Sequence, residues 1–546
     1  MMDADVLIVG GGPVGMSLAV ELGLQGCRCV LIERDDRSGL APRAKTTNVR
    51  SRELMRRWGI AERLAAAAPF GIDYPSNVVF ATRLTGRELA RFSNAFYCSP
   101  VRDDRFAEHA QWIPQYKVEQ VLRTRAAEFP GVELRMATKL EDWRDFDGGF
   151  EARLTDRHSG RSYTIRASYL VGADGARSTV RERLGIRMQG ASPLSHNHNI
   201  VFRSPGLAQR HPLGPAVMYW LINSEVPSVV APLDRGDYWT FGCPKLAQAD
   251  SAPADLIRAA LGLEIDIEIV SRDEWTAHQL IADQYRSGRA FLVGDACHLH
   301  PPYGGHGMNM GIGDAVDLGW KLAAVTRGWG GERLLDSYEI ERRQVHRRVV
   351  DEAVFNHGYS SRRLTVDGIE DEGPDGDAVR AAVGAQILAT KRREFDSLGV
   401  VIGGGYRHSP VLAVEDSADA RPTAAAALAE TDSSTYVPSA RPGSRAPHAW
   451  LADGRANGAS LYDHFAVDSL TLLIMHGAAR AAADEAAAAA AEAGIPLRVI
   501  EPGGVDLRSL YEADLALIRP DQHVAWRGRR AADARAALML ACGRGP

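Results

Sequence analysis

The fold is decided by residues 4–34, which read ADVLIVGGGPVGMSLAVELGLQGCRCVLIER. The apolar run 6–9 predicts a buried parallel strand, residues 16–24 predict a helix, and the apolar run 29–32 predicts a second strand. A G-x-G-x-x-G pattern lies between the first strand and the helix, and Glu33 closes the second strand. Strand, glycine turn, helix, strand and acid together form the fingerprint of a dinucleotide-binding unit.

Each part of this pattern has a physical role. Gly10 permits a tight turn, Gly12 lets the backbone approach a pyrophosphate, and Gly15 lets the helix pack against the strand. The N-terminus of the helix offers unpaired N–H groups and a partial positive charge to phosphates. Glu33 can accept hydrogen bonds from an adenosine ribose and would repel a 2′-phosphate there. The sequence therefore predicts that an adenine dinucleotide binds at this turn.

Length, composition and charge are those of an ordinary globular protein. The 546 residues are enough for two to four domains, with 45% apolar and 24% charged residues. A net charge of −5 favours neither nucleic acid nor an acidic membrane surface. Asp3, Asp5, the glycines and Glu21 exclude a signal peptide or membrane anchor in the opening stretch. We therefore expect a cytoplasmic protein whose partners include neither nucleic acid nor a membrane.

The six cysteines predict neither a disulfide scaffold nor a redox site. They are few for a chain of this length, and none belongs to a C-x-x-C pair. Cys297, His298, His300 and His306 form a cluster that could be read as a metal site. No carboxylate at helical spacing completes a familiar ligand set, so we expect no metal.

Basic and acidic residues after the fingerprint extend the predicted binding site. Residues 41–59 carry five arginines and a lysine. Among them Arg43 is placed to reach a pyrophosphate, and Ser51 is a plausible cap for a helix that starts at residue 52. Further on, the apolar strand 169–171 runs into Asp174. An acid at the carboxyl end of such a strand points into the crevice where α/β sheets bind ligands.

A second glycine-rich stretch follows a later buried strand. The apolar residues 290–293 end in Gly294 and Asp295, and a loop rich in proline and glycine follows. The loop leads into a long helix that we expect from about Gly311 to Val325. A glycine-rich loop that enters a helix N-terminus is a second device for binding anions or carbonyl groups.

The rest of the chain divides by pattern into a β-rich segment and a C-terminal α/β segment. Residues 186–283 have little helical pattern and many β-branched and aromatic residues, which predicts a separate sheet that covers a substrate. Residues 403–439 have the composition of a linker. The strands and helices expected after it resemble a thioredoxin-like domain without redox cysteines.

Three motifs in this order resemble those of the group A flavoprotein monooxygenases, the single-component aromatic hydroxylases related to p-hydroxybenzoate hydroxylase. They are GGGPVG with Glu33, GADGARSTVR, and FLVGDACHLHPPYGGHGMNMGIGDAVDLGWKLA. The C-terminal segments RPGSRAPHAWL, SLYD and RPDQHVAWR look like the larger phenol- and polyketide-hydroxylase types. The resemblance covers nearly the whole chain.

This resemblance implies an α/β fold with three domains. Residues 1–185 and 284–400 are expected to form a discontinuous, Rossmann-like FAD-binding domain. Residues 186–283 would be an inserted β-rich substrate-binding domain, and residues 401–546 a linker followed by a thioredoxin-like domain.

The same resemblance implies where the cofactor binds. In that family the first motif binds the ADP half of FAD, and the Asp-Gly motif serves FAD and the nicotinamide cofactor. The Gly-Asp motif contacts the ribityl chain, and the loop after it wraps the isoalloxazine. His306 stands where many relatives have glutamine, and no substrate-binding residue is implied. The expected cofactor-binding residues are Gly10, Gly12, Pro13, Val14, Gly15, Glu33, Arg34, Arg43, Gln115, Asp174, Gly294, Asp295, Pro302, Gly305, Gly307, Met308 and Asn309.

The implied activity is hydroxylation of a phenolic or polycyclic aromatic substrate. Non-covalently bound FAD would be reduced by transiently bound NAD(P)H and would react with O2 to give a flavin hydroperoxide that attacks the ring. A histidine or tyrosine is expected to deprotonate the substrate, with none singled out. A homo-oligomer stays open.

Other activities share the same cofactor residues. A Baeyer–Villiger oxygenase of the same fold, or a non-catalytic flavoprotein that sequesters an aromatic ligand, are the alternatives. A flavin-dependent halogenase is disfavoured, because its W-x-W-x-I-P signature is absent from the sequence.

Overall fold

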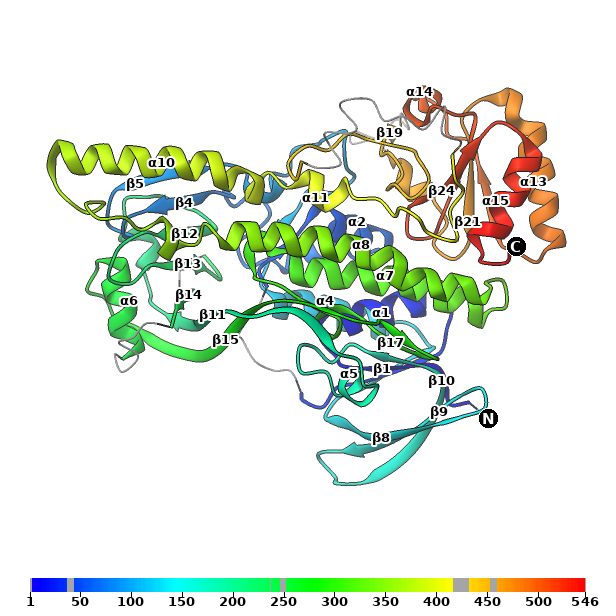
Figure 1. Cartoon of the computed structure of the whole chain (residues 1–546), viewed down its shortest axis with the longest axis horizontal. Helices are drawn as coiled ribbons and strands as arrows, with labels where there is room; N and C mark the ends of the chain where they lie inside the picture. Colours follow the sequence, from blue (N-terminus) through cyan, green and yellow to red (C-terminus); the bar gives the residue numbers. More distant parts are fainter. Residues whose placement is uncertain are drawn as a thin grey trace.

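The computed structural model describes residues 2–36, 44–235, 237–245, 252–415, 432–451 and 459–545. Within these residues, two eight-stranded sheets and a four-stranded C-terminal sheet are joined by long helices that cross the middle of the molecule (Figure 1). The predicted α/β class is therefore confirmed.

The first sheet is built on the stretch that opens the chain. Its strand order is β16-β17-β10-β1-β2-β7, and the neighbours from β17 to β7 run parallel. A hairpin of β8 and β9 extends β10 and projects at the bottom of Figure 1. The strands β1 and β2 are almost wholly buried, and α1 connects them, so the predicted Rossmann-like unit is confirmed. The strands are β1 (Ala4–Val9), β2 (Cys29–Ile32), β7 (Val132–Arg135), β8 (Thr138–Phe146), β9 (Gly149–Asp156), β10 (Ser162–Gly172), β16 (Arg286–Ser287) and β17 (Ala290–Leu292).

Helices cover this sheet and carry its glycine motifs. Helix α1 (Pro13–Leu24) packs against both α4 (Gln115–Ala127) and α7 (His306–Thr326), and α8 (Glu332–His357) lies along α7. The expectation that the helix after the glycine-rich stretch starts at about Gly311 was wrong, because α7 begins at His306. Shorter helices on this part of the chain are α2 (Val49–Arg57), α3 (Ala61–Ala67) and α5 (Thr179–Arg183).

The glycines inside α7 serve packing and do not break the helix. A Cβ on Gly311 would lie 2.4 Å from Cγ2 of Val14, and a Cβ on Gly319 would lie 2.5 Å from Cγ of Glu21. Both partners belong to α1, so the glycines let α7 approach α1 more closely than any other residue would allow.

The second sheet draws its strands from three parts of the chain. Its order is β18-β15-β11-β14-β13-β12-β4-β5, with β4 and β5 coming from the segment before α4 and β18 from the segment after β17. The long strands β11 and β15 pair along most of their length and are visible as a curved ribbon in Figure 1. The domain boundaries expected from the sequence stay a prediction. The strands are β4 (Val78–Ala81), β5 (Glu88–Phe92), β11 (Met188–Arg203), β12 (Met218–Leu221), β13 (Ser228–Pro232), β14 (Tyr238–Pro244), β15 (Glu268–Ala282) and β18 (His298–Leu299).

The two faces of the second sheet differ in side-chain size. Residues directly paired across strands share a face. Thr240 pairs with Val201 and Ala231, while Val229 pairs with Trp220 and Gly242, which places all six on the inner face. The outer face carries large residues such as Trp239 and Phe241, which pack in a cluster with α6 (Pro253–Leu261). Around Thr240 the inner face thus carries small side chains, while Trp220 and its paired neighbour Phe80 place two large aromatic rings on it.

The C-terminal sheet forms a compact unit on the other side of the long helices. Its order is β22-β21-β23-β24, with β21 parallel to β22 and antiparallel to β23, and helices α13 and α15 pack together beside it. This confirms the expected thioredoxin-like domain, and its single cysteine, Cys542, is buried. The elements after α8 are α9 (Ser361–Leu364), α10 (Gly373–Phe395), α11 (Leu398–Ile402), β19 (Trp450–Leu451), β20 (Ala459–Ser460), β21 (Leu470–Ile474), α13 (Arg480–Glu492), β22 (Leu497–Ile500), α14 (Leu507–Tyr511), β23 (Leu515–Ile518), β24 (Val524–Gly528) and α15 (Ala531–Ala541).

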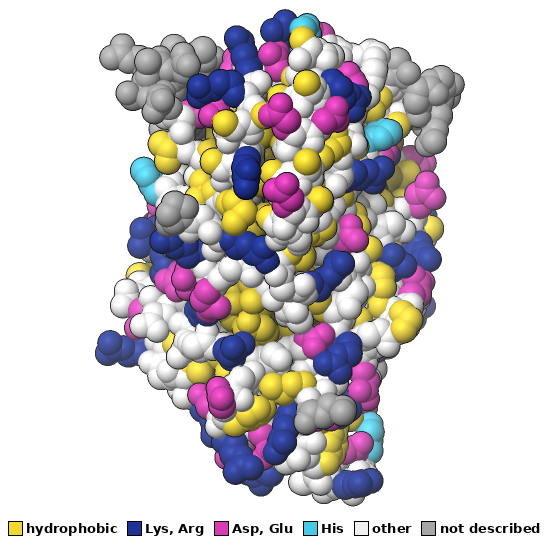
Figure 2. Space-filling view, turned by 90° about the vertical axis from the view of Figure 1, so that its right-hand side faces the viewer, with side chains coloured by type: hydrophobic (Ala, Val, Ile, Leu, Met, Phe, Trp, Pro, Cys, Tyr) yellow, Lys and Arg dark blue, Asp and Glu magenta, His cyan; other side chains and the backbone are white. Residues whose placement is uncertain are grey.

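The surface mixes both signs of charge. Figure 2 looks onto the side formed by the C-terminal unit at the top and the β8–β9 hairpin at the bottom, where basic and acidic side chains are interspersed. Among the described helices, none combines the length and apolar character needed to cross a membrane.

Candidate active site

The turn between β1 and α1 forms a cradle of backbone. Gly10 has a φ of 113°, and a Cβ there would lie 2.3 Å from the carbonyl oxygen of Ala173. A Cβ on Gly15 would lie 1.9 Å from the carbonyl oxygen of Gly10, so both positions require glycine. Helix α1 begins at Pro13 after Gly12, which has no side chain to cap it. The first N–H groups of the helix are therefore available to a phosphate.

Glu33 closes one side of this cradle at the end of β2. Its Oε2 accepts a hydrogen bond from the Gly11 amide at 2.8 Å, and its Oε1 accepts one from the Asp35 amide at 3.0 Å. A Cβ on Gly11 would lie 2.7 Å from Cβ of Glu33, so the turn holds the carboxylate in place. Arg34, also expected at the cofactor, is exposed and pairs with Asp35 at 3.3 Å.

Gln115 and Asp174 are both engaged with their own chain. Gln115 accepts a hydrogen bond on Oε1 from the Ala44 amide at 3.1 Å and thereby fixes the segment that leads into β3 (Thr46–Thr47). Asp174 follows β10 as expected, and its Oδ2 accepts from the Val180 amide at 3.0 Å at the start of α5. Burial raises the pKa of the Asp174 carboxyl. Arg43, the remaining candidate in this region, lies outside the described residues.

Asp314, which the sequence did not single out, fixes the Gly294–Asp295 turn. The Gly294 amide donates to Oδ2 of Asp314 at 3.0 Å, and Gly294 itself has a φ of 63°. A Cβ on Gly294 would lie 3.0 Å from Cγ2 of Val14, so the turn rests on the first residues of α1. Asp295, half-buried, follows this fixed point. The two glycine motifs are thus in direct contact.

The Asp314 carboxylate is the centre of a fully buried network. It accepts hydrogen bonds from Nε2 of His298 at 2.9 Å, Nε2 of His346 at 2.7 Å and Nε of Arg342 at 2.7 Å. Burial alone would raise the pKa of Asp314, but the neighbouring His346 and Arg342 hold it well below its usual value. Burial lowers the pKa of His346 to about 3, so this histidine is neutral and accepts from the Tyr285 hydroxyl at 2.8 Å.

This network also bears on the metal interpretation. Among the described residues, the group with metal-ligand types close together is Cys297, His298, Asp314 and His346, whose ligand atoms lie within 4.8 Å of one another. His300 and His306 are not part of it. The Nε2 atoms of His298 and His346 already form hydrogen bonds with Asp314. Oδ1 of Asp314 accepts from both His346 and Arg342. The contacts describe hydrogen bonding that positions the Gly294 turn.

Asn309 ties the first turn of α7 to the segment before α2. Its Nδ2 donates to the carbonyl oxygens of Thr46 at 2.9 Å and Gly305 at 2.6 Å, and its Oδ1 accepts from the Asn48 amide at 2.9 Å. The cap of α2 is Asn48, whose side chain accepts from the Ser51 amide, so the expected cap at Ser51 was wrong. Asn309 is therefore a brace of the site.

The glycine-rich loop, residues 300–305, connects β18 to α7. It turns through Gly304 and Gly305, with φ values of 78° and 65°, and Pro302 is exposed on it. Gly307 and Met308 follow in the first turn of α7, not in the loop as expected. A Cβ on Gly307 would lie 3.7 Å from Nε2 of His300, which leaves the backbone open on that side.

Residues of α10, which no sequence pattern indicated, hold the loop against the second sheet. Glu394 Oε1 accepts from the Gly304 amide at 3.1 Å, and its Oε2 accepts from Nζ of Lys391 at 2.6 Å. Nζ of Lys391 lies 4.2 Å from the Trp220 ring centre and 5.1 Å from that of Tyr303. Loop, helix and inner face of the second sheet therefore meet at one buried cluster.

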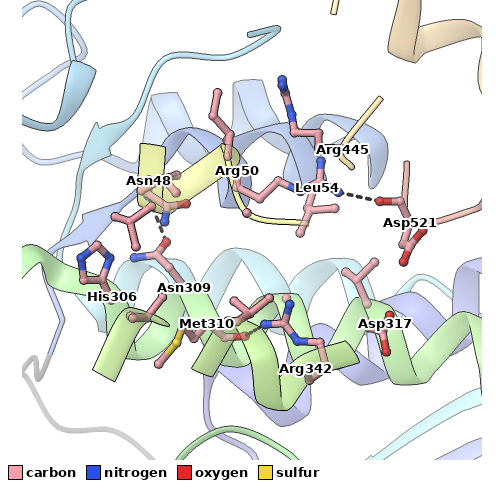
Figure 3. Close-up of a pocket in the computed structure, with 18 of the residues that line it drawn as sticks. Asn48, Arg50, Leu54, His306, Asn309, Met310, Asp317, Arg342, Arg445 and Asp521 are labelled. Carbon is pink, nitrogen blue, oxygen red and sulfur yellow. Dashed lines mark hydrogen bonds between the residues drawn. The ribbon is translucent and has the colours of Figure 1, made fainter. Parts of the chain in front are cut away.

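A cavity of about 80 Å³ lies behind Asn309, on the side toward the C-terminal unit. Figure 3 shows Asn48 and Asn309 at one end and Arg342, Asp317 and Asp521 at the other. Arg50 on α2 donates from Nη2 to the carbonyl oxygen of Asp521 at 2.6 Å. The C-terminal unit thus contributes to the wall of the cavity next to Asn309.

Comparisons with known proteins agree with this geometry. The profile of the family described as "FAD binding domain" matches residues 3–353, and that of "Aromatic-ring hydroxylase, C-terminal" matches residues 439–544. A putative polyketide hydroxylase of Streptomyces halstedii is 34% identical over 566 residues, covering 96% of this chain and 93% of that protein. Aklavinone 12-hydroxylase DnrF of Streptomyces peucetius is 36% identical over 471 residues, covering 82% and 87%.

A solved structure extends the likeness to the whole fold. The rebeccamycin biosynthetic enzyme RebC with reduced flavin matches with a TM-score of 0.90 at 33% identity, over 100% of this chain and 99% of that chain.

Proposed function

The chain belongs to the FAD-dependent aromatic-ring hydroxylases, and on this basis we propose that it uses NAD(P)H and O2 to hydroxylate a polycyclic phenolic substrate. It is an FAD-dependent monooxygenase. The aromatic hydroxylases among its relatives include one named for aklavinone, which supports a fused-ring substrate of that kind for this chain.

The described residues fit FAD. The uncapped start of α1 and the glycine cradle around Gly10 and Gly15 leave room for a pyrophosphate, and Glu33 stands where a ribose would lie. At the other end, the buried Nε2 atoms of His300 and His306 have no hydrogen-bond partner among the described residues. We assign the ADP half to the first motif and the ribityl chain to Asp295.

The observation that carries the proposal is the meeting of the glycine-rich loop with the inner face of the second sheet. The ring centres of Tyr303 and Trp220 lie 5.7 Å apart, and Glu394 holds the loop at Gly304. A planar substrate between loop and sheet would be shielded from water by the buried side chains of α10. Excluding water limits the wasteful release of hydrogen peroxide.

FAD, when bound, supplies the electron transfer from NAD(P)H and the activation of O2. The chain's own residues orient and enclose the reactants. Asn309 of α7 and Gln115 of α4 hold residues 44–48 in place, and Asp314 holds the Gly294 turn. The substrate's ring system would lie along the small inner-face side chains of Val201, Ala231 and Val229.

The experiment that tests this proposal is turnover under labelled oxygen gas. Purified holoenzyme is mixed with NAD(P)H and a panel that contains aklavinone and simple hydroxyanthraquinones, and the products are weighed by mass spectrometry. One labelled atom on a ring carbon supports hydroxylation. A label in a new lactone supports Baeyer–Villiger chemistry, and binding of a ring compound without any label or NAD(P)H consumption supports a sequestering flavoprotein.

A further inference from the structure

Lys45 lies where the FAD-binding part of the chain meets the second sheet. Its carbonyl oxygen accepts from the Ile113 amide at 2.7 Å, and the carbonyl of the next residue, Thr46, accepts from Nδ2 of Asn309. The backbone at Lys45 is therefore fixed next to the first turn of α7. Its side chain leaves this segment toward the second sheet, where Nζ donates to Oγ1 of Thr240 on β14.

Lys45 has no anionic partner among the residues that the structure describes. The fully buried lysines are different: Lys321 donates to Asp317 and Glu341, and Lys391 donates to Glu394. Desolvation lowers the pKa of the Lys45 ammonium to about 8. A partly buried ammonium without an anion costs free energy, and such groups concentrate where a ligand completes the charge balance.

The hydroxyl that holds Lys45 belongs to the inner face of the second sheet. Thr240 pairs with Ala231 on β13, and Trp220 pairs with Val229 on the same strand, so both side chains point to the same side. Thr240 and Trp220 are two strands apart and offset by two residues along β13, which together is roughly 12 Å at the usual strand geometry. The small inner-face residues Ala231 and Val229 thus lie between the Lys45 contact at Thr240 and Trp220. The Trp220 ring packs against Tyr303 of the glycine-rich loop.

We propose that Lys45 binds the ionised ring oxygen of the substrate and so keeps the ring in its electron-rich, deprotonated form. This inference rests on the proposed function. Below about pH 8 the side chain enters as an ammonium, and the substrate hydroxyl releases its proton to solvent. A phenolate or enolate directs electron density to its ortho and para carbons, and its anchoring by Lys45 would present one of those carbons to the loop.

The test uses FAD-loaded protein without NAD(P)H and the probe 1,2-dihydroxyanthraquinone, whose visible absorbance moves to longer wavelength when a hydroxyl ionises. Near neutral pH, wild type should shift the bound probe to its ionised spectrum. Lys45→Met should lose this shift and weaken probe binding about 10- to 100-fold, the loss typical of a charged hydrogen bond. Lys45→Arg should restore part of both.

Matched controls separate this role from a structural one. Lys245→Met removes a cation that follows β14 but pairs with Glu274 at 3.2 Å, and it should leave the probe spectrum and affinity unchanged. FAD affinity should be unchanged in Lys45→Met. An equal ionised spectrum in Lys45→Met and wild type would overturn the proposal, as would a loss of FAD affinity in Lys45→Met as large as its loss of probe affinity.

The outcome is distinguishable from failure of the proposed function. If the probe's ionisation depends on Lys45 but labelled oxygen never enters a ring product, the site assignment stands and the hydroxylase proposal fails. If labelled product forms equally well in Lys45→Met, the hydroxylase proposal stands and the assignment of Lys45 fails. Absence of any binding of hydroxyanthraquinone to wild-type holoenzyme overturns the assignment as well.

Discussion

Arg519 of the C-terminal unit donates from Nη1 to Oε1 of Glu341 on α8 at 2.7 Å, and both side chains are fully buried. The same guanidinium reaches Asp317 on α7 and Asp521 beside it, and Lys321 bonds both Asp317 and Glu341. Three carboxylates thus share two cations. Burial raises the pKa of Asp317, and the neighbouring Lys321 and Arg519 oppose that rise.

The first prediction concerns this buried group. Arg519→Met should lower the free energy of unfolding by about 3–5 kcal/mol, because it strands carboxylates without their cation in the interior. Urea unfolding measures the loss. Arg530→Met is the control, since its pair with Asp533 is exposed on the arginine side, and the expected loss is below about 1 kcal/mol. Equal losses in the two variants would show that Arg519 does not hold the unit in place.

The second prediction tests the cofactor assignment of Asp295. Asp295→Ala should weaken FAD binding several-fold to about 100-fold, because it removes a charged acceptor assigned to the ribityl chain. FAD fluorescence titration of apoprotein gives the dissociation constant. Asp336→Ala, on the exposed face of α8, is the control. An FAD dissociation constant equal to wild type would show that Asp295 is misassigned.

The third prediction follows from the absence of space at Gly15. Gly15→Ala would bring its Cβ within 1.9 Å of the Gly10 carbonyl oxygen, so helix α1 must move and the phosphate cradle must distort. We expect protein that is less stable and purifies without its yellow cofactor. Gly503→Ala, where a Cβ would meet nothing within 4 Å, should retain the cofactor. Bound flavin at the wild-type level in Gly15→Ala would contradict the cradle.

The fourth prediction is a pH dependence from His306. Burial lowers the pKa of His306 to about 4, whereas an unfolded histidine titrates near 6.5. Between these values the unfolded chain binds the proton and the folded chain does not. Stability from this group is therefore complete above pH 6.5 and falls by up to about 1.4 kcal/mol per pH unit as the pH drops toward 4.

His306→Gln should flatten that slope, because glutamine does not titrate. Melting temperatures of both proteins between pH 4.5 and 7 give the comparison, and the wild-type value should fall more steeply than that of the variant as the pH drops below 6.5. Parallel curves over the whole range would mean that His306 becomes protonated in the folded protein as easily as in the unfolded chain.

The fifth prediction concerns the thiols. All six cysteines are buried, and burial raises the pKa of Cys542 to about 12, so no thiolate is available near neutral pH. Folded protein should react slowly with a thiol reagent, and all six thiols per chain should react only after unfolding. Cys542→Ser should keep substrate-dependent NAD(P)H consumption. Loss of turnover with FAD still bound would give the C-terminal unit a redox role.

The sequence predicted those parts of the site that depend on local backbone. Gly10, Gly15 and Glu33 lie within one strand–helix–strand unit, and steric rules alone give their roles. It failed at α7 because glycines there were read as loop formers. In the structure Gly305, with its positive φ, ends the loop, and Gly311 serves contact with α1.

Residues that act through distant contacts could not be predicted. Lys45 and Thr240 are separated by 195 positions, and Gly304 and Glu394 by 90. Nothing in the local pattern around either pair marks it, because the pairing depends on how the second sheet and α10 close over the loop. Asp314 sits on a helix with no charge pattern that points to Gly294.

The short strand β18 has a mechanical consequence. It is the edge of the second sheet, where Leu299 pairs with Leu280 and His298 with Ile281, and it runs directly into the glycine-rich loop. Just before it, β17 belongs to the first sheet. A tilt of the second sheet would therefore have to move the glycine-rich loop with it or break these two pairings.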